Sequence, residues 1–292
     1  MAIITLTADK ALRREFIERA ITKKMNPMLQ FKDLFPVVDL QGATTFKYFE
    51  DDISAEDDIK SGVMTEPMEI SELSKLTKLE VSPINRKIGD VTQFGYAIDF
   101  SKKIQRENGF IDELLRAYER AAYGMARKIN LDVFNTIDTY ASGQAPTIAK
   151  EWSEDDANIP IDIIHGKQKF EDVEGYDYTL TDLFVNTENY REAEIAYRYL
   201  PQTFNNGNIE GVQLTNCKQL VQSGTAYAID MNLKPITIYK NVDTEHSTMD
   251  GGIINVNTYT DVEYPFSTHI ELYCELGIAA KVNKAMSKWT GL

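Results

Sequence analysis

The sequence is poor in the residues that most enzymes use for chemistry. Its 292 residues include only two cysteines and three histidines. Histidine is the usual acid–base group near neutral pH, and the sequence places it singly, at His165, His246 and His269. It contains no phosphate-binding glycine loop, no nucleophile elbow and no paired-cysteine metal pattern. We therefore expect no enzymatic activity, no catalytic residues, no cofactor and no metal site.

Long apolar runs and a disulfide framework are also missing. No stretch approaches the roughly 18 to 20 uninterrupted apolar residues that a membrane span requires. The apolar start is followed at once by Asp9 and Lys10, which makes it too short for a signal peptide. Cys217 and Cys274 cannot form a disulfide scaffold, so we expect both to be reduced and buried. These features predict a protein made in a cytoplasm, with no membrane partner.

Negative charge dominates except at the N-terminus. The net charge is -14, yet residues 1–32 hold seven basic and three acidic residues, a net of +4 that leaves -18 for the rest. Such an acidic body argues against a dedicated DNA-binding enzyme. A basic arm on an acidic body suits docking onto a neighbour's acidic surface, or loose contact with nucleic acid. The alternative is that the basic residues form the solvated face of an amphipathic helix. That helix is expected over residues 8–24, and its basic residues include Arg13, Arg14, Lys23 and Lys24.

Residues 44–100 have the pattern of a long hairpin. An aromatic opening leads through the acidic stretch 50–58 to a turn at Ser61-Gly62, and the return ends in the alternating strand 94–100. A two-stranded ribbon is marginally stable alone, so we expect another subunit to support it, the alternative being a surface loop without a partner. The expected contacts between subunits are Phe46, Tyr48 and Phe49 at the base and Ile59, Val63 and Met64 at the tip.

A long amphipathic helix is predicted next, over residues 110–138. Apolar residues recur there at steps of three and four, which forms one continuous stripe. At 1.5 Å per residue the helix is on the order of 40 Å long. The glycine within it, Gly124, indicates a close approach of another backbone.

Residues 161–229 read as a smaller mixed region. A helix over 161–170 precedes the apolar strand 183–185, and Asn186 or Thr187 can cap the helix that follows. Leu200-Pro201 ends that helix and leads to a loop tip made of Asn205, Asn206, Gly207 and Asn208. Further strands are expected at 209–212, 226–229, 236–239, 253–256, 269–273 and 277–282.

The order of these features resembles that of tailed-phage major capsid proteins of the Hong Kong 97 type. In that family a helix start rich in asparagine, a Leu-Pro loop, an Ile-Xaa-Gly-Val strand and a Gly-Ala-Tyr-type strand recur together, as at 186–229 here. The resemblance implies an α+β capsid fold. Its parts would be an N-terminal arm (1–43), an extended loop (44–100), a peripheral domain with a spine helix (101–144 and 256–292) and an axial domain (145–255), with residues 205–208 at the centre of each capsomer.

The same resemblance implies a function. The chain would self-assemble through pentamers and hexamers into an icosahedral shell around the packaged double-stranded DNA of a tailed virus. It would work with scaffold, portal and decoration proteins, touch the DNA non-specifically, and reside in the virion after assembly in the host cytoplasm. The founding member cross-links a loop lysine to a neighbour's asparagine, for which Lys60 and Asn283 are the matching residue types here; we assign no catalytic role to them. Because only some 40 residues precede the hairpin, we expect a separate scaffold protein or a chain already processed.

Two other functions compete with this interpretation. An encapsulin-type nanocompartment has the same fold but encloses a protein cargo, so the contents of the particle distinguish it from a virus. A monomeric ligand-binding or hydrolytic α+β domain would instead remain small in solution and hold its hairpin without a partner.

Overall fold

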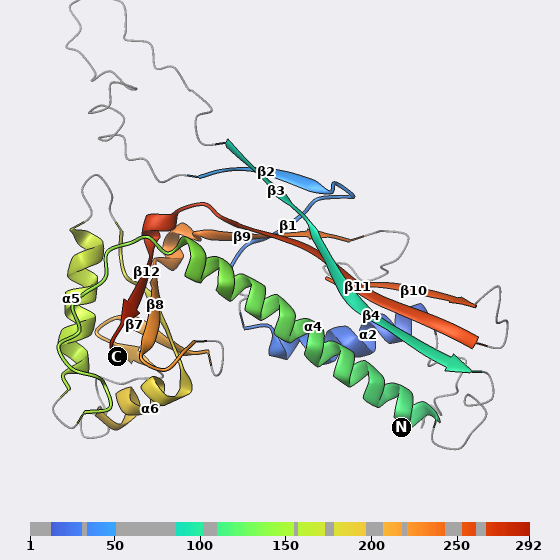
Figure 1. Ribbon diagram of the computed structural model, residues 1–292, viewed down its shortest axis with the longest axis horizontal. Helices are drawn as coiled ribbons and strands as arrows, with labels where there is room; N and C mark the ends of the chain where they lie inside the picture. Colours follow the sequence, from blue (N-terminus) through green and yellow to red (C-terminus); the bar gives the residue numbers. More distant parts are fainter. Residues whose placement is uncertain are drawn as a thin grey trace, which may run out of the picture. The chain divides into compact units, whose positions relative to one another are not determined.

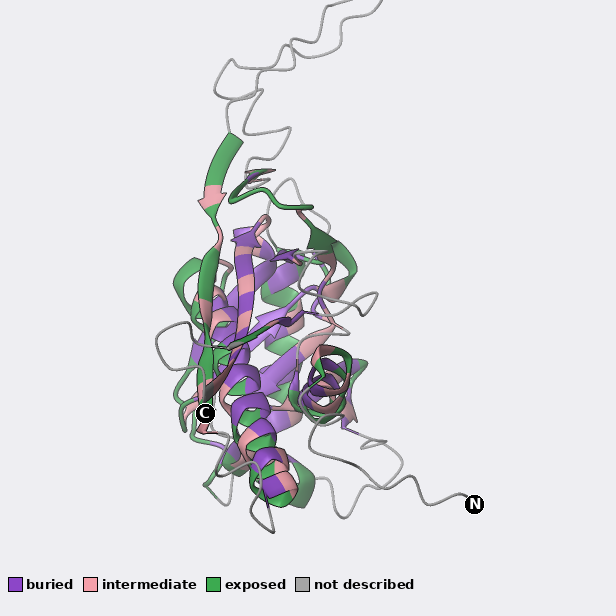
Figure 2. Ribbon diagram, turned by 90° about the vertical axis from the view of Figure 1, so that its right-hand side faces the viewer, coloured by how far each residue is buried: buried purple, intermediate pink, exposed green. Residues whose placement is uncertain are grey.

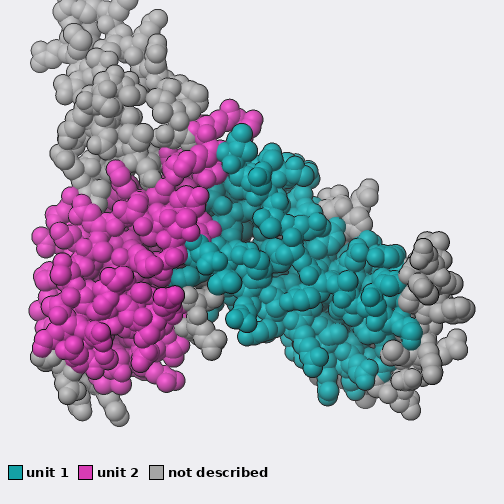
Figure 3. Space-filling model, viewed as in Figure 1, with its two compact units in different colours: residues 1–46, 88–135, 237–279 teal, residues 47–87, 136–236, 280–292 magenta. Residues whose placement is uncertain are grey.

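The computed structural model (Figure 1) describes residues 13–30, 34–50, 86–101, 110–154, 157–172, 178–196, 207–217, 221–242, 253–260 and 267–292. The chain folds into two compact units, shown in Figure 3. Unit 1 contains residues 1–46, 88–135 and 237–279, and unit 2 contains residues 47–87, 136–236 and 280–292. Each unit is therefore assembled from segments far apart in the sequence. No helix in the described part of the chain is long and apolar enough to cross a membrane.

The predicted long helix is confirmed as α4, Phe110–Tyr140. Its apolar stripe is buried, with Leu114 and Val133 fully covered, while the opposite side is exposed, and Figure 2 shows both kinds of residue along the helix. Two acidic residues in the first turn suit the positive end of the helix dipole. The close approach at Gly124 comes from a side chain and not from a backbone, because a Cβ there would lie 2.1 Å from the hydroxyl oxygen of Tyr96.

The sheet of unit 1 is built on one long strand, β11 (Ser267–Ala280). The strand order is β1 (Val37–Asp39), β9 (Ile236–Asn241), β11 and β10 (Asn255–Thr260), and β4 (Thr92–Ser101) also pairs with β11. β1 and β9 are parallel, whereas β10 and β4 run antiparallel to β11. The sequence predicted two strands, 269–273 and 277–282, where the structure has one. The predicted strand 94–100 is present as β4, but its partner is β11.

The N-terminal basic segment is an integral part of unit 1. α2 (Arg14–Met25) is followed by the short 3-10 helix η1 (Asn26–Met28), where Pro27 ends the α-helix as predicted. Ile17, Ile21 and Met25 are fully buried, and α2 packs against β10. The described part of the predicted arm is thus a docked helix, and residues 1–12 lie outside the described residues.

Unit 2 holds a second five-stranded sheet and two helices. The strand order is β12 (Met286–Thr290), β8 (Thr225–Ile229), β5 (Asp182–Val185), β7 (Val212–Asn216) and β6 (Asn208–Ile209). The helices are α5 (Ile159–Glu171) and α6 (Thr187–Ala196), and a short 3-10 helix, η4 (Asn283–Ala285), precedes β12. Because β12 pairs with β8, the last residues of the chain belong to this sheet, whereas the sequence division counted 256–292 as one peripheral segment.

A local signal predicted the start of α6, whereas α5 begins two residues before the predicted helix 161–170, with Asn158 as its cap. The side-chain oxygen of Asn186 accepts a hydrogen bond from the backbone N–H of Asn189 at 2.7 Å, so Asn186 caps α6. Thr187, the other candidate, instead donates a hydrogen bond from its hydroxyl to the side-chain oxygen of Asn216 at 3.1 Å.

Both cysteines are free and buried, as predicted. Burial raises the pKa of the Cys217 thiol to about 12, which keeps it protonated and unreactive.

Candidate assembly surfaces

The base of the predicted loop is a two-stranded ribbon of β2 (Thr45–Phe49) and β3 (Arg86–Asp90). Phe46 on β2 is only 4% exposed and its ring stacks on Tyr239 with centroids 4.1 Å apart. A Cβ added at Gly89 or Gly277 would collide with the Phe46 ring at 2.4 Å or 2.1 Å. Phe46 is therefore a core residue of its own unit, which corrects its assignment to a contact between subunits.

The other aromatic residues of the ribbon are less covered. Tyr48 is half-buried and Phe49 is 59% exposed. Ile88 on β3 is 68% exposed; sequence reasoning missed it, although an isoleucine alone between charged neighbours and a glycine was a visible signal. The predicted tip residues Ile59, Val63 and Met64 lie outside the described residues. Phe49 and Ile88 are therefore the most exposed apolar side chains in the described part of this ribbon.

A polar cluster holds the part of the ribbon that belongs to unit 2. The Glu50 carboxylate pairs with the ammonium of Lys87 and accepts a hydrogen bond from the Asn283 side-chain amide at 2.6 Å. The hydrogen bond that the Lys87 ammonium donates to Glu50 is the main reason that the pKa of Lys87 is raised, so this lysine stays protonated and is no nucleophile. Asn283 therefore anchors the ribbon of its own chain. Its supposed cross-linking partner Lys60 lies outside the described residues.

The predicted capsomer-centre loop is described only at its end. Gly207 is buried, and its carbonyl accepts a hydrogen bond from the Leu214 N–H at 2.7 Å. Asn208 accepts one from the Gly211 N–H at 3.1 Å and begins the hairpin of β6 and β7. Glu210 and Gly211 both have positive φ, 52° and 82°, as a type I′ turn requires. The exposed tip here is thus Glu210-Gly211; Asn205 and Asn206 lie outside the described residues.

The basic residues of the N-terminal segment differ in exposure. Arg13 precedes α2 and is exposed, and Arg14 is half-buried. Lys23 and Lys24 are exposed in the last turn, where they suit the negative end of the helix dipole. Lys24 pairs with Glu119 of α4 at 2.6 Å, and this hydrogen-bonded pair lowers the pKa of the Glu119 carboxyl.

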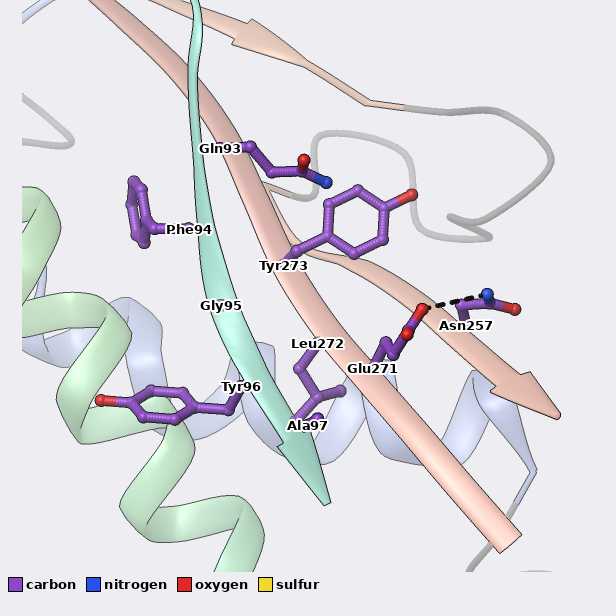
Figure 4. Close-up of a pocket in the computed structure, with 9 residues that line it drawn as sticks. All are labelled: Gln93, Phe94, Gly95, Tyr96, Ala97, Asn257, Glu271, Leu272 and Tyr273. Carbon is purple, nitrogen blue, oxygen red and sulfur yellow. Dashed lines mark hydrogen bonds between the residues drawn. The ribbon is translucent and has the colours of Figure 1, made fainter. Parts of the chain in front are cut away.

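Figure 4 shows a shallow hollow on the sheet of unit 1, with a volume of about 500 Å³. It lies over β4, β11 and β10, and its polar side chains are Gln93, Asn257, Glu271 and Tyr273. Glu271 is occupied within the sheet, because it accepts hydrogen bonds from Tyr259 at 2.9 Å and Asn257 at 3.3 Å. A carboxylate held in this way is a structural group. The described residues also contain no cluster of ligands able to hold a metal ion.

The fold and the sequence agree with known shell proteins. The model of a family described as phage capsid protein matches residues 86–281, more than half of the chain. The capsid of cyanophage P-SCSP1u is similar with a TM-score of 0.60 and 9% identity, covering 89% of this chain and 87% of that chain. The capsid of Myoviridae phage XM1 is similar with a TM-score of 0.56 and 13% identity, covering 90% and 92%.

One similar structure is a compartment shell. The SrpI encapsulin complex from Synechococcus elongatus has a TM-score of 0.56 and 10% identity, covering 94% of this chain and 89% of that chain. No curated protein matches the chain by sequence. The predicted α+β fold of the Hong Kong 97 type is confirmed. The chain belongs to the phage capsid protein family and is therefore a structural shell protein and not an enzyme.

Proposed function

We propose that this chain is the major capsid protein of a tailed virus and that its copies form an icosahedral shell around packaged double-stranded DNA. The observation that carries the proposal is the family match over residues 86–281. The likeness to two phage capsids over about nine-tenths of the chain supports it. Assembly proceeds through pentamers and hexamers, in which many weak contacts gain strength because symmetry repeats them.

The parts of the chain take different roles in this proposal. Unit 2, with the sheet from β12 to β6, acts as the axial domain that clusters around five-fold and six-fold axes. Unit 1, with most of α4 and the sheet around β11, acts as the peripheral domain. The loop beyond the β2–β3 ribbon laps over a neighbouring subunit, with Phe49 and Ile88 at its exposed base. Scaffold, portal and decoration proteins act with the shell, which assembles in the host cytoplasm and becomes part of the virion.

The second candidate function is an encapsulin-type compartment around a protein cargo. The likeness to the SrpI encapsulin favours it, because that match covers 94% of this chain. The two functions predict the same shell and differ in its contents.

Negative-stain imaging of the purified chain, together with a mass measurement in solution, tests the shell itself. We expect closed shells, or rings of five and six copies, when the protein is concentrated or supplied with its scaffold. A species that stays at 33.2 kDa, the mass of one chain, under all of these conditions would overturn the proposal. Particles isolated from the producing cells and treated with nuclease then separate the two functions. Protected double-stranded DNA supports the virus, and a defined protein cargo without DNA supports the compartment.

Deletion of the loop tip, residues 50–70, is expected to abolish shell formation and leave folded chains or single capsomers. The reason is that Phe49 and Ile88, at the exposed base of the loop, are not covered by their own unit, and a two-stranded extension of this kind is marginally stable without a neighbour. Imaging of the variant scores the shells, and circular dichroism checks that it is folded. A second variant that deletes only 51–70 keeps Glu50 and its contacts with Lys87 and Asn283. Normal shells from this second variant would refute the role of the loop.

A further inference from the structure

The exposed side of α4 carries a line of arginines. Arg116, Arg120 and Arg127 are exposed, and so is Tyr123, at 59%. At 3.6 residues per turn, steps of four and seven residues place the three arginines within an arc of about 40°. This arc is opposite the buried stripe that includes Leu114. The helix α4 therefore has a buried apolar side and, opposite it, an exposed side that carries three arginines.

The charge of these arginines is not neutralised within the described part of the chain. None of the three has an ion-pair partner there. Lys128, next to Arg127, pairs with Asp132 at 2.6 Å. Glu119, three residues after Arg116, pairs with Lys24; the hydrogen bond with Lys24 is the main cause that lowers the pKa of Glu119, and the charge of Arg116 is the smallest.

The pair of Lys24 and Glu119, both residues of unit 1, also joins the exposed sides of two helices, α2 and α4, which are labelled in Figure 1. α2 adds two more exposed cations, Arg19 and Lys23. The exposed acidic residues Glu15, Asp112 and Glu113 lie toward the helix starts, whereas Glu119, Asp132 and Asp138 are paired with lysines. We call the combined surface the basic face; the cations on it that have no ion pair within the described residues are Arg19, Lys23, Arg116, Arg120 and Arg127. It is a local exception in a chain of net charge -14.

We propose that the basic face contacts the phosphate backbone of duplex DNA without regard to its sequence. Charge complementarity selects a polyanion, and four of these five cations are arginine, whose planar group binds phosphate through two hydrogen bonds. Along the axis of α4, Arg116 and Arg120 are about 6 Å apart, and Arg120 and Arg127 about 10 Å apart. A DNA strand has a phosphate about every 3.4 Å of helix axis, so each arginine reaches a different phosphate. The hydroxyl of Tyr123, between them, is a further donor to the backbone.

The acidic remainder of the chain limits this contact to one face. DNA is repelled by the rest of the surface, so binding is weak and falls steeply as salt is added. A basic face that binds this weakly can line the inside of a shell without holding the DNA in place. In this form the inference rests on the proposed function, because the face must point toward enclosed DNA. The binding itself is measurable on chains that have not assembled.

The test measures binding of a fluorescent 30-base-pair duplex to unassembled chains over a range of salt concentrations. The variant is Arg116→Gln/Arg120→Gln/Arg127→Gln. Each phosphate contact contributes about 0.9 to the slope of log affinity against log salt, so we expect the slope to fall by about 2.7. The single variant Arg120→Gln should lower it by about 0.9 and serves if the triple variant is not folded. An unchanged slope in the folded variants would overturn the proposal.

A matched control removes the same charge elsewhere. Lys169, Arg191 and Lys234 are exposed residues of unit 2, and replacing all three with glutamine should leave the slope nearly unchanged. An equal fall in both triple variants would mean that only net charge matters and would also overturn the proposal. The proposal would also be overturned if the arginine triple variant bound DNA normally but no longer formed shells. The basic face would then be a docking site for an acidic protein segment. Failure of the unaltered chain to form shells counts against the proposed function and leaves the binding result intact.

Discussion

Replacement of Trp289 with alanine is expected to lower the free energy of unfolding by about 3–5 kcal/mol. Trp289 lies on β12 and is fully buried in the core of unit 2, which it shares with Ile163 and Phe170. Its ring lies against α5 at Gly166, where a Cβ would come within 2.2 Å of it. Alanine would leave a cavity that the flanking helix and strand cannot fill. The midpoint of unfolding in denaturant measures the loss.

Two further variants show whether the cavity is the cause. The Nε1–H of Trp289 has no hydrogen-bond partner among the described residues, and an unmet buried donor costs about 1–3 kcal/mol. Trp289→Phe removes this donor and keeps most of the ring, so its net loss should be much smaller than that of alanine. Leu233→Ala, at a residue 46% exposed, should change stability by less than about 0.5 kcal/mol. Equal losses for Trp289→Phe and Trp289→Ala would contradict this account.

Elements defined by local periodicity were predictable from the sequence. α4 follows from apolar residues at steps of three and four, and its end differs by two residues from the expected one. β4 follows from the alternation of Phe94, Tyr96, Ile98 and Phe100. The cap of α6 follows from the short polar side chains at 186 and 187. In each case the sequence signal lies within a few residues along the chain.

Features that depend on distant residues were misread. Two strands were expected, the second starting at Gly277, but Gly277 lies inside the single strand β11, where the Phe46 ring occupies the space of a side chain. Phe46 in turn looked available to another subunit until its stacking on Tyr239 was known. Likewise, the pairing of β12 with β8 joins segments some 60 residues apart, and no local pattern indicates it.

The candidate surfaces were predictable only in part, because a contact between subunits leaves no periodic signal in one chain. Residue type alone predicted that Phe49 is an exposed aromatic side chain, but it predicted the same for Phe46, which is buried. The arginines of α4 were visible in the sequence at helical spacing. Their importance emerges only when Lys24 of α2 is seen to neutralise Glu119 beside them. Charge balance depends on tertiary contacts even where helix formation does not.

Replacement of Gly95 with alanine is expected to destabilise unit 1 by about 1–3 kcal/mol or more. Gly95 lies on β4 opposite Tyr273 of β11. A Cβ there would be 2.0 Å from the carbonyl oxygen of Leu272 and 2.7 Å from the Cα of Tyr273. Both are backbone atoms of the paired strand, so they can yield only if β4 and β11 separate. Thermal unfolding, together with hydrogen exchange of the β4 amides, measures the effect.

The same substitution at Gly124 provides the control, because the obstacle there is of a different kind. Its Cβ would meet the hydroxyl oxygen of Tyr96 at 2.1 Å, which is the far end of a side chain that is 48% exposed and free to rotate outward. Alanine also gains about 1 kcal/mol of helix propensity over glycine. Gly124→Ala should therefore be neutral or stabilising, where Gly95→Ala is destabilising. Similar losses at the two sites would show that Tyr96 is held as rigidly as the backbone of β11.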